Sequence, residues 1–592
     1  MNVANAAFQF ARDLSPLETA PATPFAFDGM AGFFHAADGD TAVLLLSPWG
    51  YEELCTHKSI RLLAERLAAA GFPCLRFDYP ATGHSLGASA ALDDETAWRK
   101  SVKRALEELR RLTEPRRIIV IGQGLGGALA GDLARDTDLD GLVLMAPVIQ
   151  GRTYLRELTA WTAMTKPSFL VSASDGPEGG LMAGGFVLSA ATTKEVRALD
   201  LTKDWTPRAE KILLVARDDH GGDAMLAEIL ADRGLTPDTI PFERYADYVS
   251  DSVFSIIIDD IIEKVVAWCS TNFPLEQVMP RRDRDLPAEL SGPDFRETLL
   301  RFGPDHDMFG VFTEPTGAPS GTAYLFLNTG LDHSIGWGRM VVDFARTLAR
   351  EGHAGFRIDV TGIGETRLRP GQAPEVMYTD THIGDVKEAI DWLLDGHGIE
   401  RVILVGRCSG SYLAGISAAA DERVSGVAII NARRLVWDTR ADFEKEFGRP
   451  VRALEAYKRR LSDGKTLRKI LTGQVPVRKI VAKLTEGVYR EADRALAPLL
   501  GRLTWHGQLG HILNTRLATL RDRGTAVELI YSNEDAGPRD LEMWFGDAFD
   551  GLAKYPNIKL SFISHADHNV TPIDAREAVL EKLRDIASRV CD

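Results

Sequence analysis

Cysteine and net positive charge are both scarce in this sequence. Its 592 residues carry a formal net charge of −15, which argues against a general nucleic-acid binder. The five cysteines show neither paired nor metal-ligand spacing, and they are Cys55, Cys74, Cys269, Cys408 and Cys591. These features favour a reduced protein in the cytoplasm. We expect it to bind no nucleic acid, no metal and no cofactor.

Long apolar runs are absent as well. No stretch of about 18 apolar residues occurs, so we expect no transmembrane segment. The beginning of the chain lacks the basic-then-apolar pattern of a secretory signal. The most apolar stretch, residues 255–262, is interrupted by Asp259 and Asp260 and is typical of a packed helix.

The length predicts two domains, because 592 residues exceed what one hydrophobic core usually supports. An internal repeat agrees with this. Asp78 corresponds to Asp359 at an offset of 281, and the run from Gly141 corresponds to that from Gly426 at an offset of 285. The next matching segments, residues 214–219 and 530–535, are offset by 316. The second half therefore carries about 31 extra residues between two predicted strands, where we expect a cap.

Both halves alternate short β-branched or aliphatic runs with helical patterns. In the first half, the apolar run 42–46 precedes a helical pattern at 59–70 and a second apolar run at 73–77. Such nearly continuous apolar strands predict a mostly parallel sheet covered by helices on both faces. The predicted fold class is therefore α/β, with two tandem domains.

The expected boundaries follow from the repeat and from composition. Residues 1–272 form the first domain, and residues 273–294, rich in Pro, Arg and Asp, form a linker. Residues 295–592 form the second domain, with a larger helical cap at about 436–523.

A candidate nucleophile follows an apolar strand in the second half. Residues 401–405 lead directly into Gly406-Arg407-Cys408-Ser409-Gly410. A Gly-x-nucleophile-x-Gly turn between a strand and a helix lifts the nucleophile above the sheet. The matching turn in the first half has Gly124 at the nucleophile position. The first half therefore lacks a side chain that could attack, and we expect the backbone angle at Gly124 to tolerate a side chain poorly.

A thiol requires a base and an orienting acid to react at neutral pH. Asp535 follows the predicted strand 527–532, and His568 follows the predicted strand 558–563. The chain order Cys408, Asp535, His568 matches the order in enzymes with this turn. We expect His568 to take the thiol proton and Asp535 to fix the imidazole tautomer.

Neighbouring residues compete for these two roles. Glu534 precedes Asp535, and His565 lies three residues before His568. The repeat favours His568, whose counterpart is Tyr248. A phenol titrates near pH 10 and cannot serve as a base near neutrality. Three other histidines are typical of ordinary surface or core positions: His333, His382 and His397.

An oxyanion intermediate requires two hydrogen-bond donors. The backbone N–H of Ser409 is one candidate. The loop after the predicted strand 323–327 supplies the other, from the N–H of Gly330 or Leu331. A plain tight turn is the alternative interpretation of that loop.

The predicted cap is rich in basic residues, although the chain as a whole is acidic. The run is either a solvated helix face or a surface that steers an anionic substrate, such as a carrier-bound phosphopantetheine or an acidic glycan. Arg468 and Lys469 are our candidates for substrate binding. Trp437 is a candidate for the wall of an acyl or ring pocket, with core packing as the alternative.

Two loops resemble those of a known family. Phe77-Asp-Tyr-Pro-Ala-Thr-Gly-His-Ser85 and Ile358-Asp-Val-Thr-Gly-Ile-Gly-Glu-Thr366 resemble the D-x-x-G-x-G-x-S/T loop of serine-aminopeptidase-like α/β-hydrolases, which include hydrolases associated with exosortase loci. A cysteine nucleophile is similar to that of dienelactone hydrolase. The resemblance implies two α/β-hydrolase domains. It does not imply peptidase activity, because Cys408 replaces serine and the first half lacks both nucleophile and histidine.

Three functions follow, in order of preference. The first is a hydrolase that cleaves an ester or thioester through an acyl-Cys408 intermediate on a small-molecule or carrier-bound acyl substrate, which the basic cap would favour as an anion. The second is an acyltransferase or cyclase with the same intermediate. The third is a binding or scaffolding protein without catalysis. We expect the first half to serve in packing, in homodimer formation or in closing over the second site.

Overall fold

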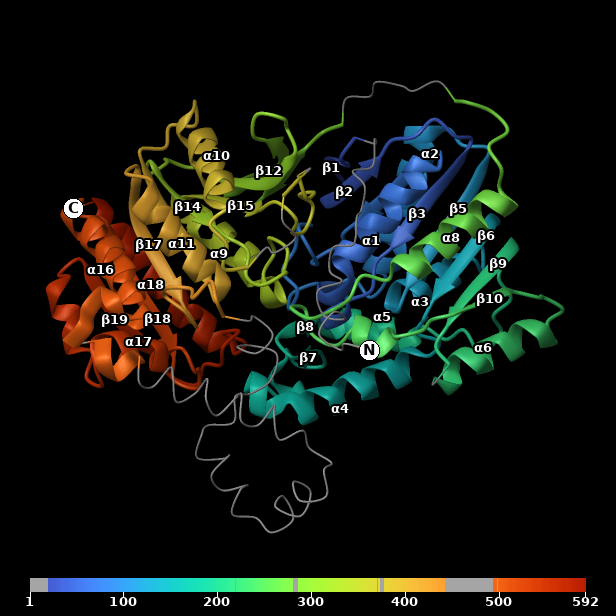
Figure 1. The fold of residues 1–592 in the computed structure, drawn as a ribbon. Coiled ribbons are helices and arrows are strands. Elements are labelled where there is room, and N and C mark those ends of the chain that lie inside the picture. Colours follow the sequence, from blue (N-terminus) through green and yellow to red (C-terminus); the bar gives the residue numbers. More distant parts are fainter. Residues whose placement is uncertain are drawn as a thin grey trace, which may run out of the picture. The chain divides into compact units, whose positions relative to one another are not determined.

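The computed structural model describes residues 20–218, 220–279, 286–369, 371–372, 377–441, 493–497 and 499–591 (Figure 1). Contacts divide the chain into two compact units. The first consists of Met1–Arg433, Thr525–Pro538 and Ile558–Asp592, and it holds both predicted α/β halves. The second consists of Arg434–Gly524 and Arg539–Asn557, which includes the predicted cap. The expected boundaries at 272 and 295 remain predictions, because both halves belong to one unit.

The first half is built on a sheet of eight described strands in the order β1-β2-β4-β3-β5-β6-β9-β10. The β1–β2 and β2–β4 pairs are antiparallel, and the other pairs are parallel. The strands are β1 (Thr23–Phe27), β2 (Met30–His35), β3 (Thr41–Leu46), β4 (Cys74–Phe77), β5 (Arg117–Gln123), β6 (Leu139–Met145), β9 (Ala209–Ala216) and β10 (Asp238–Pro241).

Helices cover both faces of this sheet, which explains its continuous apolar strands. Val43 and Leu45 of β3 belong to a core with α1 (Tyr51–Ala69) and α8 (Asp259–Asn272). Leu44 and Leu46 belong to the opposite core, with α2 (Ala97–Thr113) and α3 (Leu125–Leu133).

The second half repeats this plan with nine described strands in the order β11-β12-β13-β15-β14-β16-β17-β18-β19. The pairs from β11 to β15 are antiparallel, and those from β15 to β19 are parallel. The strands are β11 (Glu289–Gly292), β12 (Phe295–Phe302), β13 (Met308–Pro315), β14 (Thr322–Phe326), β15 (Ala354–Asp359), β16 (Arg401–Arg407), β17 (Val424–Ile430), β18 (Ala526–Ser532) and β19 (Ile558–Ile563). The helices are α9 (Met340–Arg350), α10 (Ile383–Leu394), α11 (Ser409–Ala420) and α18 (Ile573–Cys591).

The two sheets confirm the predicted fold class, and their central strands follow the repeat. The order β4-β3-β5-β6-β9 in the first sheet corresponds to β15-β14-β16-β17-β18 in the second. Strand β11 lies entirely within the predicted linker, residues 273–294. A short edge strand with one buried residue leaves little apolar pattern in the sequence.

Each half has an insertion after the strand that follows its Gly-x-x-x-Gly turn, which is β6 in the first half and β17 in the second. In the first half it contains α4 (Gly151–Phe169), η3 (Ala173–Asp175), the hairpin of β7 (Leu181–Ala183) and β8 (Phe186–Leu188), and α5 (Ala190–Ala198). The second unit contains η5 (Gly501–Leu503), α16 (Trp505–Asp522) and η6 (Asp550–Lys554), and α17 (Pro538–Phe545) begins at its edge. Arg468 and Lys469 lie outside the described residues. No helix in the described part of the chain has both the length and the apolarity of a bilayer span.

Within the first unit, the two halves meet along their antiparallel edges. Ala31 and Phe33 of β2 pack with Phe309 and Val311 of β13 in a small buried core. The rings of Phe33 and Phe309 are 5.4 Å apart. The Arg339 guanidinium donates hydrogen bonds to the carbonyls of Gly83 and Gly87 at 2.8 Å, so charged groups also cross this contact.

Candidate active site

The predicted nucleophile stands in a sharp turn between β16 and α11. Cys408 has φ 53° and ψ −116°, a strained conformation of the kind that clusters at functional sites. A Cβ atom at Gly406 would lie 2.1 Å from the Gly410 carbonyl oxygen, and one at Gly410 would lie 2.4 Å from that of Asn328. Only glycine fits at these two positions, so the two glycines of the motif permit the turn.

The strand ends bring three predicted residues together. Nδ1 of His568 lies 2.8 Å from Oδ1 of Asp535, and the Cys408 thiol interacts with the His568 imidazole. Because Asp535 engages Nδ1, the other ring nitrogen is left for the thiol. The competing residues Glu534 and His565 are both exposed.

The electrostatics of these groups favour a charged thiol–imidazole pair. Burial opposes ionisation of Cys408, but the neighbouring His568 outweighs it and lowers the pKa of the thiol. Burial likewise opposes protonation of His568, yet Cys408 and Asp535 raise the pKa of its imidazole. Burial also works against the charge of Asp535, whose pKa is nevertheless lowered by its hydrogen bond with His568. A thiolate beside an imidazolium is a reactive nucleophile.

Two residues that the sequence did not single out hold the His568 loop. The Asn431 amide donates hydrogen bonds to Ser532 Oγ at 2.9 Å and to the His568 carbonyl at 3.0 Å. Arg407 donates to Asn569 Oδ1 at 2.6 Å. The signal that could have found them is their place in the chain. Arg407 ends β16 and Asn431 directly follows β17, and the carboxyl ends of these strands form the edge of the sheet where the site lies.

The expected oxyanion donors differ in how they are engaged. Ser409 begins α11, so its N–H has no acceptor within the helix. The Gly330 N–H instead donates to the Ser409 hydroxyl at 2.8 Å. This bond occupies the Gly330 N–H, so of the two loop candidates Leu331 stays the predicted second donor.

The first half contributes to the surroundings of this loop. A Cβ atom at Gly330 would lie 3.0 Å from the Val253 side chain. The Ser252 side chain interacts with the Asp332 carboxyl and favours its charged form. Residues from the segment before α8 thus support the loop that follows β14.

The first-half turn has the same backbone but no room for a nucleophile. Gly124 has φ 54° and ψ −120°, nearly the values of Cys408. A side chain at this positive φ would be strained, as we expected. A Cβ atom there would lie 2.4 Å from Glu52 Oε2, and the Glu52 carboxylate accepts hydrogen bonds from Gln123 at 3.0 Å and Tyr245 at 2.8 Å. A half-buried carboxylate occupies the space that a nucleophile would require.

Two further first-half residues correspond to His568 and Asp535. Tyr248 is fully buried, and its hydroxyl donates to Gln123 at 3.1 Å. Burial raises the pKa of Tyr248 further above its usual range. Asp219, the counterpart of Asp535, lies outside the described residues.

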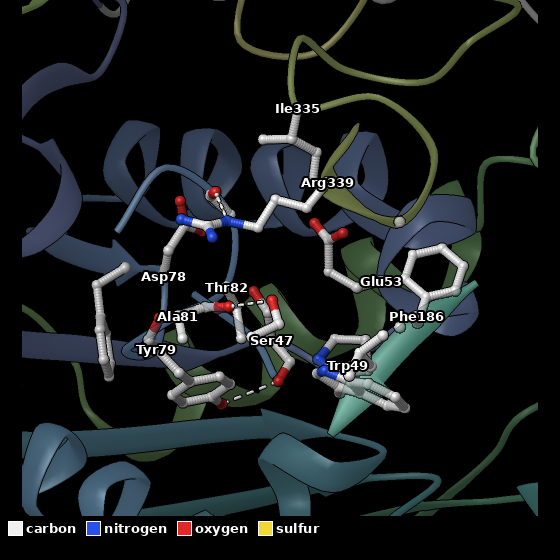
Figure 2. Close-up of a pocket in the computed structure, with 17 residues that line it drawn as sticks. Ser47, Trp49, Glu53, Asp78, Tyr79, Ala81, Thr82, Phe186, Ile335 and Arg339 are labelled. Atoms are coloured by element: carbon white, nitrogen blue, oxygen red, sulfur yellow. Dashed lines mark hydrogen bonds between the residues drawn. The ribbon is translucent and has the colours of Figure 1, made fainter. Parts of the chain in front are cut away.

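A pocket opens at the carboxyl ends of β3 and β4 in the first unit (Figure 2). Ser47, Asp78 and Glu53 line it from the first half, and Arg339 lines it from the second. No histidine is among the residues that line this pocket in the described structure, so none of them could serve Ser47 as an imidazole base.

The remaining substrate-binding candidate lies in the other unit. Trp437 is partly buried and belongs to the second unit, together with the predicted cap. Its role in substrate binding stays a prediction.

Two family descriptions match the chain in tandem. Residues 50–200 match the family of serine aminopeptidases, S33, and residues 325–518 match the α/β-hydrolase fold family. No curated protein matches the chain at a significant level.

Three solved structures with a similar fold each cover less than half of this chain. A soluble variant of monoglyceride lipase from Saccharomyces cerevisiae is 15% identical and covers 44% of this chain and 99% of its own, with a TM-score of 0.32. An esterase from Butyrivibrio proteoclasticus with bound ferulic acid is 15% identical and covers 42% and 99%, with a TM-score of 0.31. A carboxyl esterase from Bacillus coagulans is 12% identical and covers 43% and 99%, with a TM-score of 0.32.

Proposed function

We propose that this chain, an enzyme made of two α/β-hydrolase domains in tandem, cleaves an ester or thioester through an acyl-cysteine in its second half. The observation that carries the proposal is the grouping of three side chains: the Cys408 thiol interacts with His568, and Nδ1 of His568 lies 2.8 Å from Asp535. The position of Cys408 at the start of α11 supports it, because a helix N-terminus stabilises negative charge.

In the first step, the Cys408 thiolate attacks the acyl carbon. The carbonyl oxygen becomes an oxyanion, which the N–H groups of Ser409 and Leu331 would stabilise. As the C–O or C–S bond to the leaving group breaks, the His568 imidazolium gives its proton to the departing alcohol or thiol. A thioester between the acyl group and Cys408 remains.

In the second step, water attacks that thioester. Neutral His568 takes a proton from the water, and the hydroxide adds to the acyl carbon. The C–S bond then breaks, which releases the carboxylic acid and restores the thiolate and the imidazolium. An acceptor alcohol or amine in place of water would make the same intermediate a step in acyl transfer.

The first half acts without chemistry of its own in this proposal. Gly124 has no attacking group, and Glu52 fills the space beside it. The contacts of Val253 and Ser252 with the loop that contains Gly330 and Asp332 support a role in holding the oxyanion loop. Such a role would explain why the fold of this half is intact.

A pH profile of thiol alkylation tests the nucleophile. An ordinary cysteine has a pKa of about 8.5, and the lowered pKa of Cys408 predicts that its alkylation by iodoacetamide reaches half-maximal rate below that pH. Removal of the imidazole in His568→Ala should move the midpoint upward, since burial alone opposes the thiolate. Rates are measured for each cysteine by peptide mass spectrometry.

The other cysteines provide the controls. Cys591 is exposed and gives a reference rate in the same sample. Burial raises the pKa values of Cys55, Cys74 and Cys269, so these three should react slowly at every pH. A Cys408 midpoint at or above 8.5 that His568→Ala leaves in place would contradict the proposed thiolate–imidazolium pair.

A further inference from the structure

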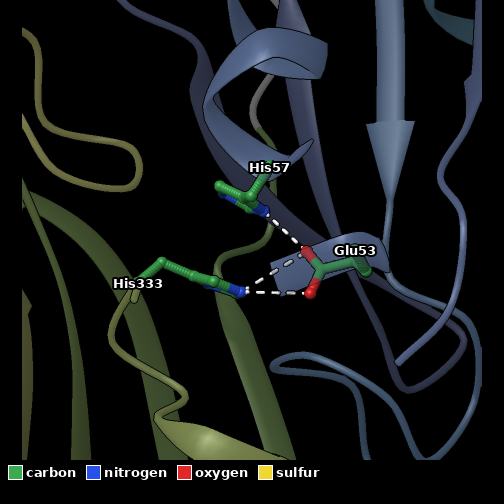
Figure 3. Close-up of side chains that lie close together, drawn as sticks. All are labelled: Glu53, His57 and His333. Atoms are coloured by element: carbon green, nitrogen blue, oxygen red, sulfur yellow. Dashed lines mark hydrogen bonds and ion pairs between the residues drawn. The ribbon is translucent and has the colours of Figure 1, made fainter. Parts of the chain in front are cut away.

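A second cluster of reactive side chains lies where the two halves meet in the first unit. Glu53 and His57, four residues apart on one face of α1, meet His333 from the loop after β14 (Figure 3). Nδ1 of His57 is 2.8 Å from the Glu53 carboxylate, and Nε2 of His333 is 3.4 Å from it. One atom from each side chain lies within 4.8 Å of the others. The cluster plays no part in the proposed reaction.

The second ring nitrogen of His57 is held by a carboxylate, as is usual for a histidine that binds a metal. Nε2 of His57 lies 2.9 Å from a Glu365 carboxylate oxygen. Arg76 holds both oxygens of that carboxylate, at 2.9 and 2.7 Å. A carboxylate on the distant nitrogen fixes the orientation and tautomer of a histidine that binds metal through its other nitrogen.

His333 carries an unexplained polar atom. Its side chain is 2% exposed, and its Nδ1 is buried without a hydrogen-bond partner in the described structure. Buried polar atoms without partners are rare and call for a physical reason. Binding of a metal ion by the His333 ring would give such a reason.

We propose that Glu53, His57 and His333 bind one divalent transition-metal ion and thereby join the two halves. Two imidazoles and one carboxylate form a ligand set that suits Zn²⁺, and a water molecule would complete a tetrahedral site. The ion would take the place of a proton on His57, whose two ring nitrogens lie 2.8 and 2.9 Å from the carboxylates of Glu53 and Glu365.

Binding requires one local movement, and the structure indicates where it occurs. The imidazole rings of His57 and His333 are stacked, with centroids 3.9 Å apart and planes 10° apart. A metal lies near the plane of each imidazole that binds it, so one ring must tilt. Glu365 restrains His57, whereas the unpartnered nitrogen of His333 leaves that ring the freer of the two. Glu53 also lines the pocket of Figure 2, which gives an ion a route to the cluster.

Metal binding to the full-length, untagged chain tests this site. Because Cys408, His568 and Asp535 could themselves bind zinc, the parent protein for the titration carries Cys408→Ala. After treatment with a chelator and dialysis, Zn²⁺ is titrated in competition with a chromophoric chelator, and bound metal is counted by mass spectrometry. We expect one ion per chain, and a higher melting temperature when Zn²⁺ is present.

Three substitutions and a matched control locate the ion. His333→Gln and Glu53→Gln should abolish stoichiometric binding and the zinc-dependent rise in melting temperature. Glu365→Gln keeps a hydrogen-bonding group and should weaken binding by about 10- to 100-fold, as for other outer partners. His353→Gln removes a part-buried histidine that contacts Ser320, outside the cluster, and should leave zinc affinity unchanged.

The outcomes are decisive in both directions. Circular dichroism of the metal-free proteins establishes that each variant is folded. A folded parent protein without stoichiometric zinc would overturn the proposal and leave a protonated histidine as the balancing cation. Zinc bound equally well by the parent and by folded His333→Gln would place the ion elsewhere and would also overturn it.

Discussion

Cys408→Ala should lower turnover of an ester or thioester substrate by roughly 10⁴- to 10⁶-fold, the range seen when the nucleophile of a triad is removed. Without the thiolate, no acyl-enzyme can form, and only the positioning of the substrate remains. Alanine has the same backbone constraints as cysteine, so the turn at φ 53° should form as before. The measurement is kcat with a chromogenic acyl ester, alongside a thermal unfolding curve.

Cys591→Ala is the matched control, because it removes an exposed thiol far along the chain at the end of α18. Its turnover should equal that of the unaltered protein. Wild-type turnover in Cys408→Ala would show that the reaction uses another group. A weakly active Cys408→Ser would indicate that His568 can also activate a hydroxyl.

Asp535→Asn should reduce kcat by about 10⁴-fold, as in other triads whose acid is changed to an amide. The carboxylate accepts a hydrogen bond from the Nδ1–H of His568 at 2.8 Å. An amide can instead donate its own N–H to Nδ1, which would place the ring proton on the nitrogen that must serve the thiol. The loss of charge would also remove part of what raises the pKa of His568.

Glu534→Gln is the control for Asp535→Asn, since the two residues are adjacent and Glu534 is exposed. It should change kcat by less than about twofold, like other surface substitutions away from a site. If Glu534→Gln were the damaging change and Asp535→Asn were silent, the acid would be misassigned.

Local sequence was enough to predict the turn around Cys408. A strand, two glycines and a helix follow one another without a gap, and the clash that a Cβ would make at Gly406 involves the backbone of Gly410 in the same motif. The fold class was predictable for a similar reason. Strands such as β3 are buried on both faces, and this burial is visible in the sequence as an uninterrupted run of apolar residues.

The partners of Cys408 were predictable only through chain order and the repeat. Asp535 and His568 lie more than a hundred residues away, yet each follows a strand whose end meets the same edge of the sheet. The structure brings them to hydrogen-bonding distance, and their catalytic roles remain predictions.

Contacts between distant segments were beyond the sequence. Nothing in the pattern around Glu52 indicates that its carboxylate fills the space beside Gly124. The sequence predicted an ordinary role for His333, because its spatial neighbours Glu53 and His57 are 280 and 276 positions away along the chain. Such pairs depend on how the two halves pack, which neither periodicity nor local motifs record.

Direct detection of the acyl-enzyme tests the central claim most sharply. The full-length protein is mixed with a panel of acyl esters and thioesters, quenched in acid, and weighed intact before its peptides are mapped. The account predicts one added acyl group per chain, on Cys408, that disappears in Cys408→Ala. Acylation of a first-half residue such as Ser47, which lines the pocket there, or Ser85, which is buried and donates to the Asp78 carbonyl at 2.6 Å, with loss of turnover when that residue is replaced, would contradict it.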